Sequence, residues 1–254
     1  MKLAFAIQVQ NVSKFFGSLR AVDGVTVDVE EKSLTILIGP NGSGKTTLIN
    51  TISGLYRADT GKVVFGGRDI TTFPPHKIYK LGLARTFQIP SLFWKLTALE
   101  NAMVAAKDNP GEGFFRSLVR SSWMNKEKET AETAFKTLEL VGLYEVWDKP
   151  AASLSGGQMK LLEIGRALMG GAKVVLLDEP ISGVNPRLAH EIFEKLVTLR
   201  TDLGVTFFII EHRLDIALKY IDTVVAMAFG KVIANGKPEV VMADPRLIEA
   251  YLGG

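Results

Sequence analysis

A glycine-rich stretch directly after a short apolar run is the feature that most constrains how this chain can fold. The run Leu34–Ile38 is apolar apart from Thr35, which is typical of a buried parallel strand. The next eight residues satisfy the phosphate-loop pattern, and they are Gly39, Pro40, Asn41, Gly42, Ser43, Gly44, Lys45 and Thr46. Glycines let the backbone curl so that successive N–H groups point at phosphate oxygens, and a helix starting near Lys45 presents its positive dipole end. The sequence therefore predicts an α/β core that binds a phosphate-bearing ligand.

Three side chains at the end of this loop suit a nucleoside triphosphate. Lys45 can reach the terminal phosphates, and the hydroxyl of Thr46 can bind a magnesium ion. Thr47 can add a second hydroxyl to the phosphate contacts. A glycine-rich turn without a ligand is the alternative, and the strand before the loop and the helix after it disfavour that alternative.

An acidic pair follows a second apolar run, residues 174–177. Asp178 ends this expected strand, Glu179 comes next, and Pro180 breaks the strand. We expect Asp178 to hold the metal through water and Glu179 to orient or deprotonate an attacking water. Without the phosphate loop, two acidic residues at a strand end would read as solvated surface.

A third segment opens a helix further along the chain, and it consists of Leu154, Ser155, Gly156, Gly157 and Gln158. Ser155 is a natural N-cap, because its hydroxyl can accept a hydrogen bond from the first turn. The two glycines beside the cap expose backbone N–H groups. The segment therefore predicts a second anion-binding helix terminus, although it could simply be a capped helix.

Composition excludes several classes of protein. The chain has 254 residues, 47% hydrophobic and 22% charged, which is enough to bury a full core. The formal charge of +3 is too weak a bias to argue for nucleic acid, and zero cysteines exclude disulfides and thiolate metal sites. No apolar run reaches the roughly 18 residues that spanning a bilayer requires. We therefore expect that this chain does not itself cross a membrane, and that any membrane-spanning part of its assembly belongs to another chain.

The pattern along the chain changes twice. Residues 21–29 alternate apolar and polar side chains, which predicts a half-exposed strand. Helical periodicity dominates residues 97–142, and its apolar face contains Ala131, Ala134, Phe135, Leu138 and Val141. Expected strands at residues 174–177 and 205–210 then alternate with expected helices at residues 186–203 and 214–220, the pattern of βα units.

Together, the loop at 39–46, the segment at 154–158 and the acidic strand at 174–180 resemble the ATP-binding cassette family, and the resemblance covers nearly the whole chain. It implies a P-loop NTPase (RecA-like) core built from residues 1–88 and 153–254, with an N-terminal antiparallel β subdomain. It also implies an α-helical subdomain inserted at residues 89–152. ATP hydrolysis is the implied activity, with ATP and Mg²⁺ as the cofactors.

Further site residues follow from this resemblance. Gln88 is expected to contact the metal and the attacking water, and His212 to hydrogen-bond the terminal phosphate. Phe16 matches the aromatic that stacks on adenine; Phe15 is an alternative, and so is an ordinary core phenylalanine. Asn185 stands where many cassettes have aspartate, which keeps hydrogen bonding but removes a charge.

The resemblance also implies partners. In the family, the signature segment of one subunit, here Ser155, Gly156, Gly157 and Gln158, closes over ATP held by the phosphate loop of another. A complete site then needs a second cassette, identical or homologous. The chain resembles a transporter's motor, which implies transmembrane permease subunits, indirectly a solute-binding protein, a place on the cytoplasmic face of the membrane, and no nucleic acid.

Apolar side chains close to Gln88 are candidates for permease docking. Leu92, Phe93 and Trp94 follow Gln88, and we expect a short permease helix to dock there. Three other aromatics, which equally fit a small core of the helical section, are Phe114, Phe115 and Trp123.

Within the family, four separated blocks resemble the cassettes of branched-chain amino acid importers: residues 82–88 followed by 96–101, then 158–161, 178–186 and 209–214. Cassettes of urea or amide importers and of lipopolysaccharide export share much of this pattern. Cassettes in DNA repair and on ribosomes bring paired cassettes or long coiled-coil insertions, which 254 residues do not accommodate. A GTPase would need Asn-Lys-x-Asp, whereas Asn125 and Lys126 precede Glu127 and Lys128.

Overall fold

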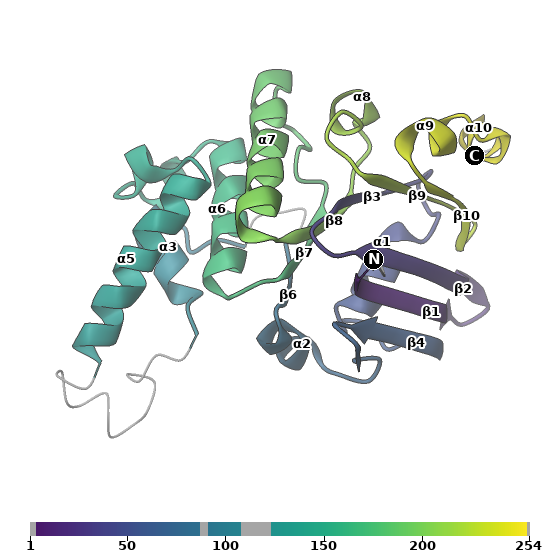
Figure 1. Cartoon of the computed structure of the whole chain (residues 1–254), viewed down its shortest axis with the longest axis horizontal. Helices are drawn as coiled ribbons and strands as arrows, with labels where there is room; N and C mark the ends of the chain where they lie inside the picture. Colours follow the sequence, from purple (N-terminus) through teal and green to yellow (C-terminus); the bar gives the residue numbers. More distant parts are fainter. Residues whose placement is uncertain (1–3, 87–90, 108–122, 253–254) are drawn as a thin grey trace. The chain divides into compact units, whose positions relative to one another are not determined.

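The structure, a computed structural model, describes residues 4–86, 91–107 and 123–252. It divides into two compact units (Figure 1): a core unit of residues 1–88 and 173–254, and a helical unit of residues 89–172. The helical unit begins where the sequence predicts a helical subdomain, at residue 89, and extends beyond the predicted end at residue 152. It therefore includes the helix that follows Ser155. No helix among the described residues is long and apolar enough to cross a membrane.

The larger sheet of the core unit has six strands in the order β10-β9-β3-β8-β7-β6. The strands are β3 (Leu34–Ile38), β6 (Leu83–Arg85), β7 (Val174–Asp178), β8 (Thr206–Ile210), β9 (Thr223–Ala228) and β10 (Lys231–Gly236). All are parallel except β10, and β3 lies between β8 and β9 with every residue buried. Parallel strands end at a common edge, so the segments after β3, β7 and β8 converge there. The α/β prediction is confirmed.

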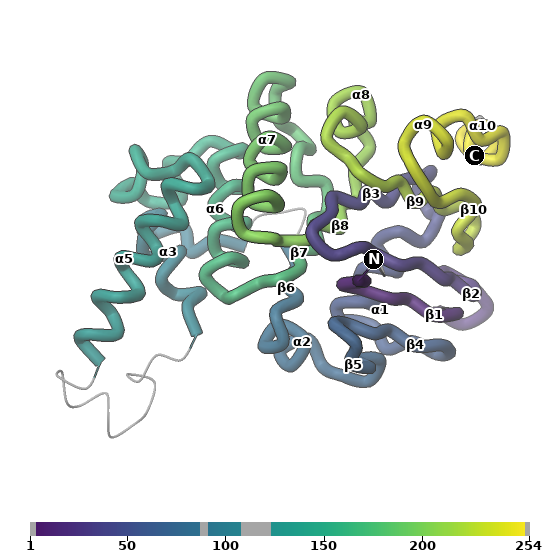
Figure 2. Tube along the Cα trace, in the orientation of Figure 1, coloured from purple at the N-terminus to yellow at the C-terminus, as the bar shows by residue number. Residues whose placement is uncertain are grey.

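The smaller sheet is antiparallel, as predicted, with the order β2-β1-β4-β5 (Figure 2). Its strands are β1 (Phe5–Phe16), β2 (Leu19–Glu30), β4 (Thr60–Phe65) and β5 (Arg68–Asp69). The alternation predicted at residues 21–29 appears in β2, where Val25, Val27 and Val29 are buried. Helix α1 (Lys45–Ile52) places its apolar side chains in one hydrophobic cluster with residues of both sheets, which fixes the phosphate loop between them.

The other helices of the core unit are α2 (Pro75–Leu81), α7 (Pro186–Leu203), α8 (Leu214–Ala217), α9 (Pro238–Met242) and α10 (Pro245–Leu252). Helix α7 has the predicted bounds, because Asn185 caps its start and Gly204, at φ 67°, ends it in the left-handed region. The predicted helix at residues 214–220 is too long. Helix α8 ends at Ala217 because the chain turns toward β9, with Tyr220 N–H donating to Ala217 O.

The described part of the helical unit contains α3 (Ala98–Val104), α5 (Met124–Leu140), α6 (Gly156–Met169) and the short 3₁₀ turns η3 (Tyr144–Val146) and η4 (Ala151–Ser153). Helices α3, α5 and α6 pack against one another (Figure 1). The predicted apolar face of residues 131–141 buries Ala134, Leu138 and Val141. A Cβ added to Gly165 of α6 would lie 3.5 Å from Val141 Cγ2, so the glycine permits close helix packing.

Candidate functional site

One cavity of the core unit brings many of the predicted site residues together. It has a volume of about 630 Å³, within the range of small-molecule sites. Its lining includes Phe16, Asn41, Gly42, Ser43, Gly44, Lys45, Thr46, Thr47, Glu179 and His212. The segments that converge at the edge of the parallel sheet thus share a space large enough for a nucleotide.

The backbone of the phosphate loop requires glycine at two of its positions. Gly39 and Gly44 have φ values of 146° and 102°. A Cβ at Gly39 would lie 2.0 Å from Met227 O, and a Cβ at Gly44 would lie 2.3 Å from Ala21 O. Because neither backbone can give way cheaply, the loop keeps its curl only with glycine at these sites.

Lys45 is buried at the base of the cavity, with 6% of its surface exposed. Its Nζ donates to Gly39 O and to Pro40 O at 2.8 Å each, and lies 3.5 Å from Ser43 Oγ. Burial lowers the pKa of Lys45, and the charges of Glu179 and Asp178 act in the opposite direction. The ammonium therefore sits among oxygen acceptors, an environment that a bound phosphate could extend.

Asp178, at the end of β7, forms an ion pair that the sequence prediction missed. Arg85 Nη2 of β6 lies 3.1 Å from Asp178 Oδ2, and the two side chains are 8% and 11% exposed. Arg85 Nη1 also donates to Asn50 Oδ1 of α1. Burial lowers the pKa of Arg85, and Asp178 raises it. An arginine ending the apolar run of β6 was the available signal, because a buried charge needs a partner.

Glu179 and His212 lie next to each other in the lining of the cavity. Glu179 Oε1 lies 3.4 Å from His212 Nε2, and the backbone N–H of Glu179 donates to Ile210 O at 2.9 Å. Glu179 has φ 51°, a left-handed conformation unusual for a glutamate. Such backbone strain is often found at functional sites, so the carboxylate's placement is a feature that the surrounding structure maintains at a cost.

Glu211 is a second residue that the sequence prediction did not assign. It is 2% exposed, and its carboxylate accepts hydrogen bonds from the N–H groups of Ile181 (2.9 Å), His212 (2.9 Å) and Arg213 (3.2 Å). It therefore ties the turn bearing His212 to the segment that follows Glu179.

Of the two candidate aromatics, Phe16 lines the cavity. Phe16 is 44% exposed, and its ring meets Tyr56 edge-on at 5.2 Å between centroids. Phe15 is not among the lining residues; its N–H donates to Asp59 Oδ2. Phe16 is thus the aromatic available to a base.

The signature residues lie at the start of α6 in the helical unit. Ser155 is the N-cap, as predicted, and forms a capping box with Gln158: Gln158 N–H donates to Ser155 Oγ at 3.3 Å, and Ser155 N–H donates to Gln158 Oε1 at 2.9 Å. The backbone at Gly156 and Gly157 begins the helix. If this segment binds an anion, as predicted, the backbone N–H groups at the start of α6 are the donors available for it.

Three predicted residues, Gln88, Phe114 and Phe115, lie outside the described residues. Of the predicted docking side chains, Phe93 and Trp94 are exposed, whereas Leu92 is buried in the helical unit. Trp123 is half-buried. Asn185 Oδ1 accepts from Leu188 N–H at 3.0 Å, a capping role that aspartate could also fill.

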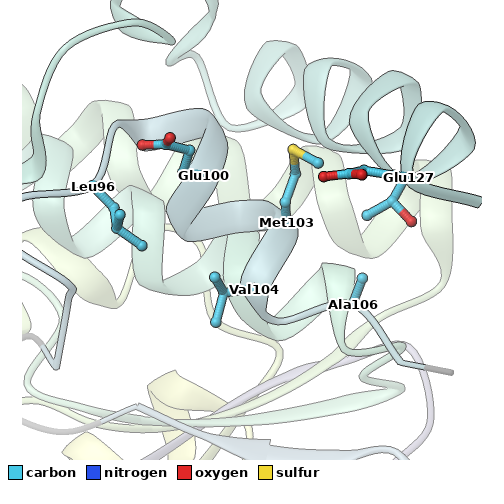
Figure 3. A pocket seen from close by; sticks show the side chains of 7 residues that line it. Leu96, Glu100, Met103, Val104, Ala106 and Glu127 are labelled. Carbon is cyan, nitrogen blue, oxygen red and sulfur yellow. The ribbon is translucent and has the colours of Figure 1, made fainter. Parts of the chain in front are cut away.

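A second cavity, of about 430 Å³, lies between α3 and α5 (Figure 3). Its lining consists of Leu96, Glu100, Met103, Val104, Ala106, Glu127 and Thr130. It shares no residue with the predicted site.

Comparisons with known proteins agree with this arrangement. The family model described as ABC transporter matches residues 22–182, and one described as branched-chain amino acid ATP-binding cassette transporter matches residues 231–254. A probable branched-chain amino acid transport ATP-binding protein of Archaeoglobus fulgidus is 53% identical over 97% of this chain and 95% of its own length. A protein of the same description from Methanocaldococcus jannaschii is 47% identical over 97% of both chains.

A solved structure, the ADP conformation of an ATP-binding cassette of an ABC transporter, is 46% identical to this chain. Its TM-score is 0.86, and the match covers 98% of this chain and 99% of that one. With the family model matching more than half of the residues, the chain belongs to the ABC transporter family of nucleotide-binding ATPases.

Proposed function

We propose that this chain is the ATP-hydrolysing subunit of an importer of branched-chain amino acids. The observation that carries the proposal is that one cavity holds the phosphate loop with Lys45, together with Glu179 and His212. The printed descriptions of the relatives supply the substrate class. No side chain of a cassette needs to touch the amino acid, since the permease and the solute-binding protein would recognise it.

The residues of the cavity have separate roles in binding and hydrolysing ATP. Loop N–H groups and Lys45 hold the phosphates and offset their charge, and Phe16 receives the base. Glu179 orients the attacking water and takes its proton, while His212, 3.4 Å from that carboxylate, hydrogen-bonds the terminal phosphate.

The donors present also fit a magnesium ion. Thr46 and Asp178 offer hydroxyl and carboxylate oxygens, which are the hard ligands that Mg²⁺ prefers, and Gln88 is the third predicted ligand. When bound, the ion supplies positive charge that offsets the charge on the phosphates. Asp178 is kept in place for this task by Arg85.

The partners follow from the single copy of each element. The start of α6, with Ser155, Gly156, Gly157 and Gln158, closes over ATP held by a second cassette, either identical or homologous. Exposed Phe93 and Trp94 offer apolar surface to a permease. The proposed location is the cytoplasmic face of the membrane, where a solute-binding protein acts indirectly through the permease.

Lys45→Ala tests the nucleotide site directly. Loss of the charge near the β and γ phosphates should impair ATP binding and hydrolysis, whereas Lys62→Ala, a change of an exposed lysine on β4, should leave both intact. Normal ATP affinity in Lys45→Ala would contradict the site.

The substrate class needs a transport measurement. The cassette, assembled with its permease in proteoliposomes that contain ATP and are supplied with the solute-binding protein outside, should drive uptake of labelled leucine, isoleucine or valine. Lys45→Ala should abolish that uptake. Uptake of urea instead would favour the alternative importer class. Export of lipopolysaccharide would favour the exporter, and copurification with nucleic acid rather than a hydrophobic permease would favour a repair or ribosomal protein.

A further inference from the structure

Phe229 is the most exposed large apolar side chain at the nucleotide cavity, with 80% of its surface accessible. It occupies the tip of the β9–β10 hairpin, where Ala228 pairs with Lys231 and leaves a two-residue turn. Phe229 and Gly230 have φ values of 49° and 77°. Positive φ at both central residues is the type I′ turn, which strongly prefers Asn-Gly or Asp-Gly.

A phenylalanine is a poor choice for this turn. A bulky residue with positive φ is a backbone outlier, because its Cβ crowds the carbonyl oxygen. The exposed ring buries little surface in return, so packing within the described fold does not offset the strain. An outlier of this kind at a ligand cavity points to a functional reason.

The hairpin tip is tied to the phosphate loop. Gly230 N–H donates to Ser43 O at 3.0 Å, and Asp23 N–H donates to Gly230 O at 2.9 Å. Both turn residues line the cavity that Phe16 and Lys45 also line. The ring of Phe229 is therefore held at the rim of the proposed nucleotide site by contacts to the loop that holds the phosphates.

We propose that Phe229 is a second aromatic contact for the nucleoside part of the nucleotide, in addition to Phe16. The inference rests on the proposed function of the cavity. Its polar loop accounts for the phosphates but offers little to the base and ribose, which present apolar faces. Aromatic side chains bind such faces with little dependence on which base is present.

Phe229→Asn tests this inference, because the substitution should preserve or raise thermal stability while it weakens ATP binding. Asparagine suits the turn, so the melting temperature should stay the same or rise. Loss of the ring should weaken ATP binding roughly 5- to 30-fold by titration calorimetry, while inorganic triphosphate, which has no nucleoside, should bind as to wild type. Phe229→Tyr, which keeps the ring, should retain ATP affinity. Val240→Asn, at an exposed residue of α9 away from the cavity, should also retain it.

Unchanged ATP affinity in Phe229→Asn would overturn the inference, including when ATP-dependent association of two cassettes weakens, because the ring would then contact the second copy. Equal loss of affinity for inorganic triphosphate would also overturn it, by showing that the loop itself had changed. The proposed function is tested separately: it fails if the wild-type chain does not bind ATP, or if Lys45→Ala binds it normally.

Discussion

Each compact unit contains an acidic side chain with little exposure to solvent, and the two carboxyl groups are stabilised in different ways. In the core unit, the Asp178 carboxylate is paired with the Arg85 guanidinium at 3.1 Å. In the helical unit, Glu163 of α6 is 9% exposed, and its Oε1 accepts from the backbone N–H of Ser91 at 2.8 Å. Burial raises the pKa of Glu163 to about 7, although Ser91 and the charges of Arg166 and Lys160 oppose this shift.

The difference lies in the partner of each carboxyl group: a permanently charged guanidinium for Asp178 and a neutral backbone N–H for Glu163. The Arg85 guanidinium stays protonated at physiological pH, so the partner of Asp178 keeps its positive charge. Glu163 gains or loses a proton near neutrality. It lies on the helix that begins with the signature segment, and it holds the chain directly before exposed Phe93 and Trp94. Arg166 donates to Ser91 O and lies 5.3 Å from the Phe93 ring centroid, which strengthens the same attachment.

The same substitution in both units gives the largest contrast. Glu179→Gln keeps the shape of the side chain but removes the base, so ATP turnover should fall by roughly 10² to 10⁴ and an ATP-bound dimer should accumulate. Glu163→Gln, which lies outside the cavity, should change turnover by less than about threefold. Steady-state hydrolysis and size-exclusion chromatography with ATP measure the two effects. Undiminished turnover in Glu179→Gln would refute its role as the base.

Removing the cation from the core pair should cost the most stability. Arg85→Met leaves Asp178, whose side chain is only 11% exposed, without its partner, which should lower the free energy of unfolding by about 3–5 kcal/mol in urea titrations. Adding Asp178→Asn should recover part of the loss, because no unpaired charge remains.

A surface ion pair provides the control. Arg187→Met breaks an exposed pair with Glu191 on α7 and should cost no more than about 0.5 kcal/mol. If Arg85→Met were equally mild, the pair would not be what stabilises Asp178.

The sequence predicted those features of the fold and of the site that depend on residues close together in the chain. The strand–loop–helix order located the phosphate loop, and the alternation of expected strands and helices located α7 at residues 186–203. The ion pair joins Arg85 to Asp178, 93 residues apart, and Glu163 reaches Ser91 over 72 residues. Such pairs depend on strand order and helix packing, which no local pattern encodes. The strained turn at Phe229 was missed because an aromatic is not a typical turn residue.

The titration of Glu163 should appear as a pH-dependent difference in stability. Its pKa is about 7 in the folded protein, against an ordinary value of 4.5 for a glutamate, so the folded state binds the proton more tightly. Stability therefore falls as pH rises from about 4.5 to about 7, by at most about 3.5 kcal/mol. Glu163→Gln does not titrate, so the wild type should lose stability relative to this variant over that range. Urea unfolding of both proteins at pH 5 and pH 8 measures the change. A difference independent of pH would show that Glu163 keeps one charge state throughout.

The smallest expected effect concerns a neutral contact in the core unit. Tyr251 of α10 accepts a hydrogen bond at its hydroxyl from Gly39 N–H at 3.1 Å, so the first residue of the phosphate loop is held from 212 residues away. Although Tyr251 is 44% exposed, partial burial raises the pKa of this hydroxyl and the Gly39 N–H opposes the shift, so the hydroxyl stays neutral at physiological pH. Tyr251→Phe removes one hydrogen bond and should weaken ATP binding about two- to fivefold, whereas Tyr144→Phe, at an exposed tyrosine of the helical unit, should not. Because this contact carries no charge, the loss should be the same at pH 6 and pH 8. A loss that varied with pH would mean that α10 supports the loop through charged groups, and the contrast between the two units would then weaken.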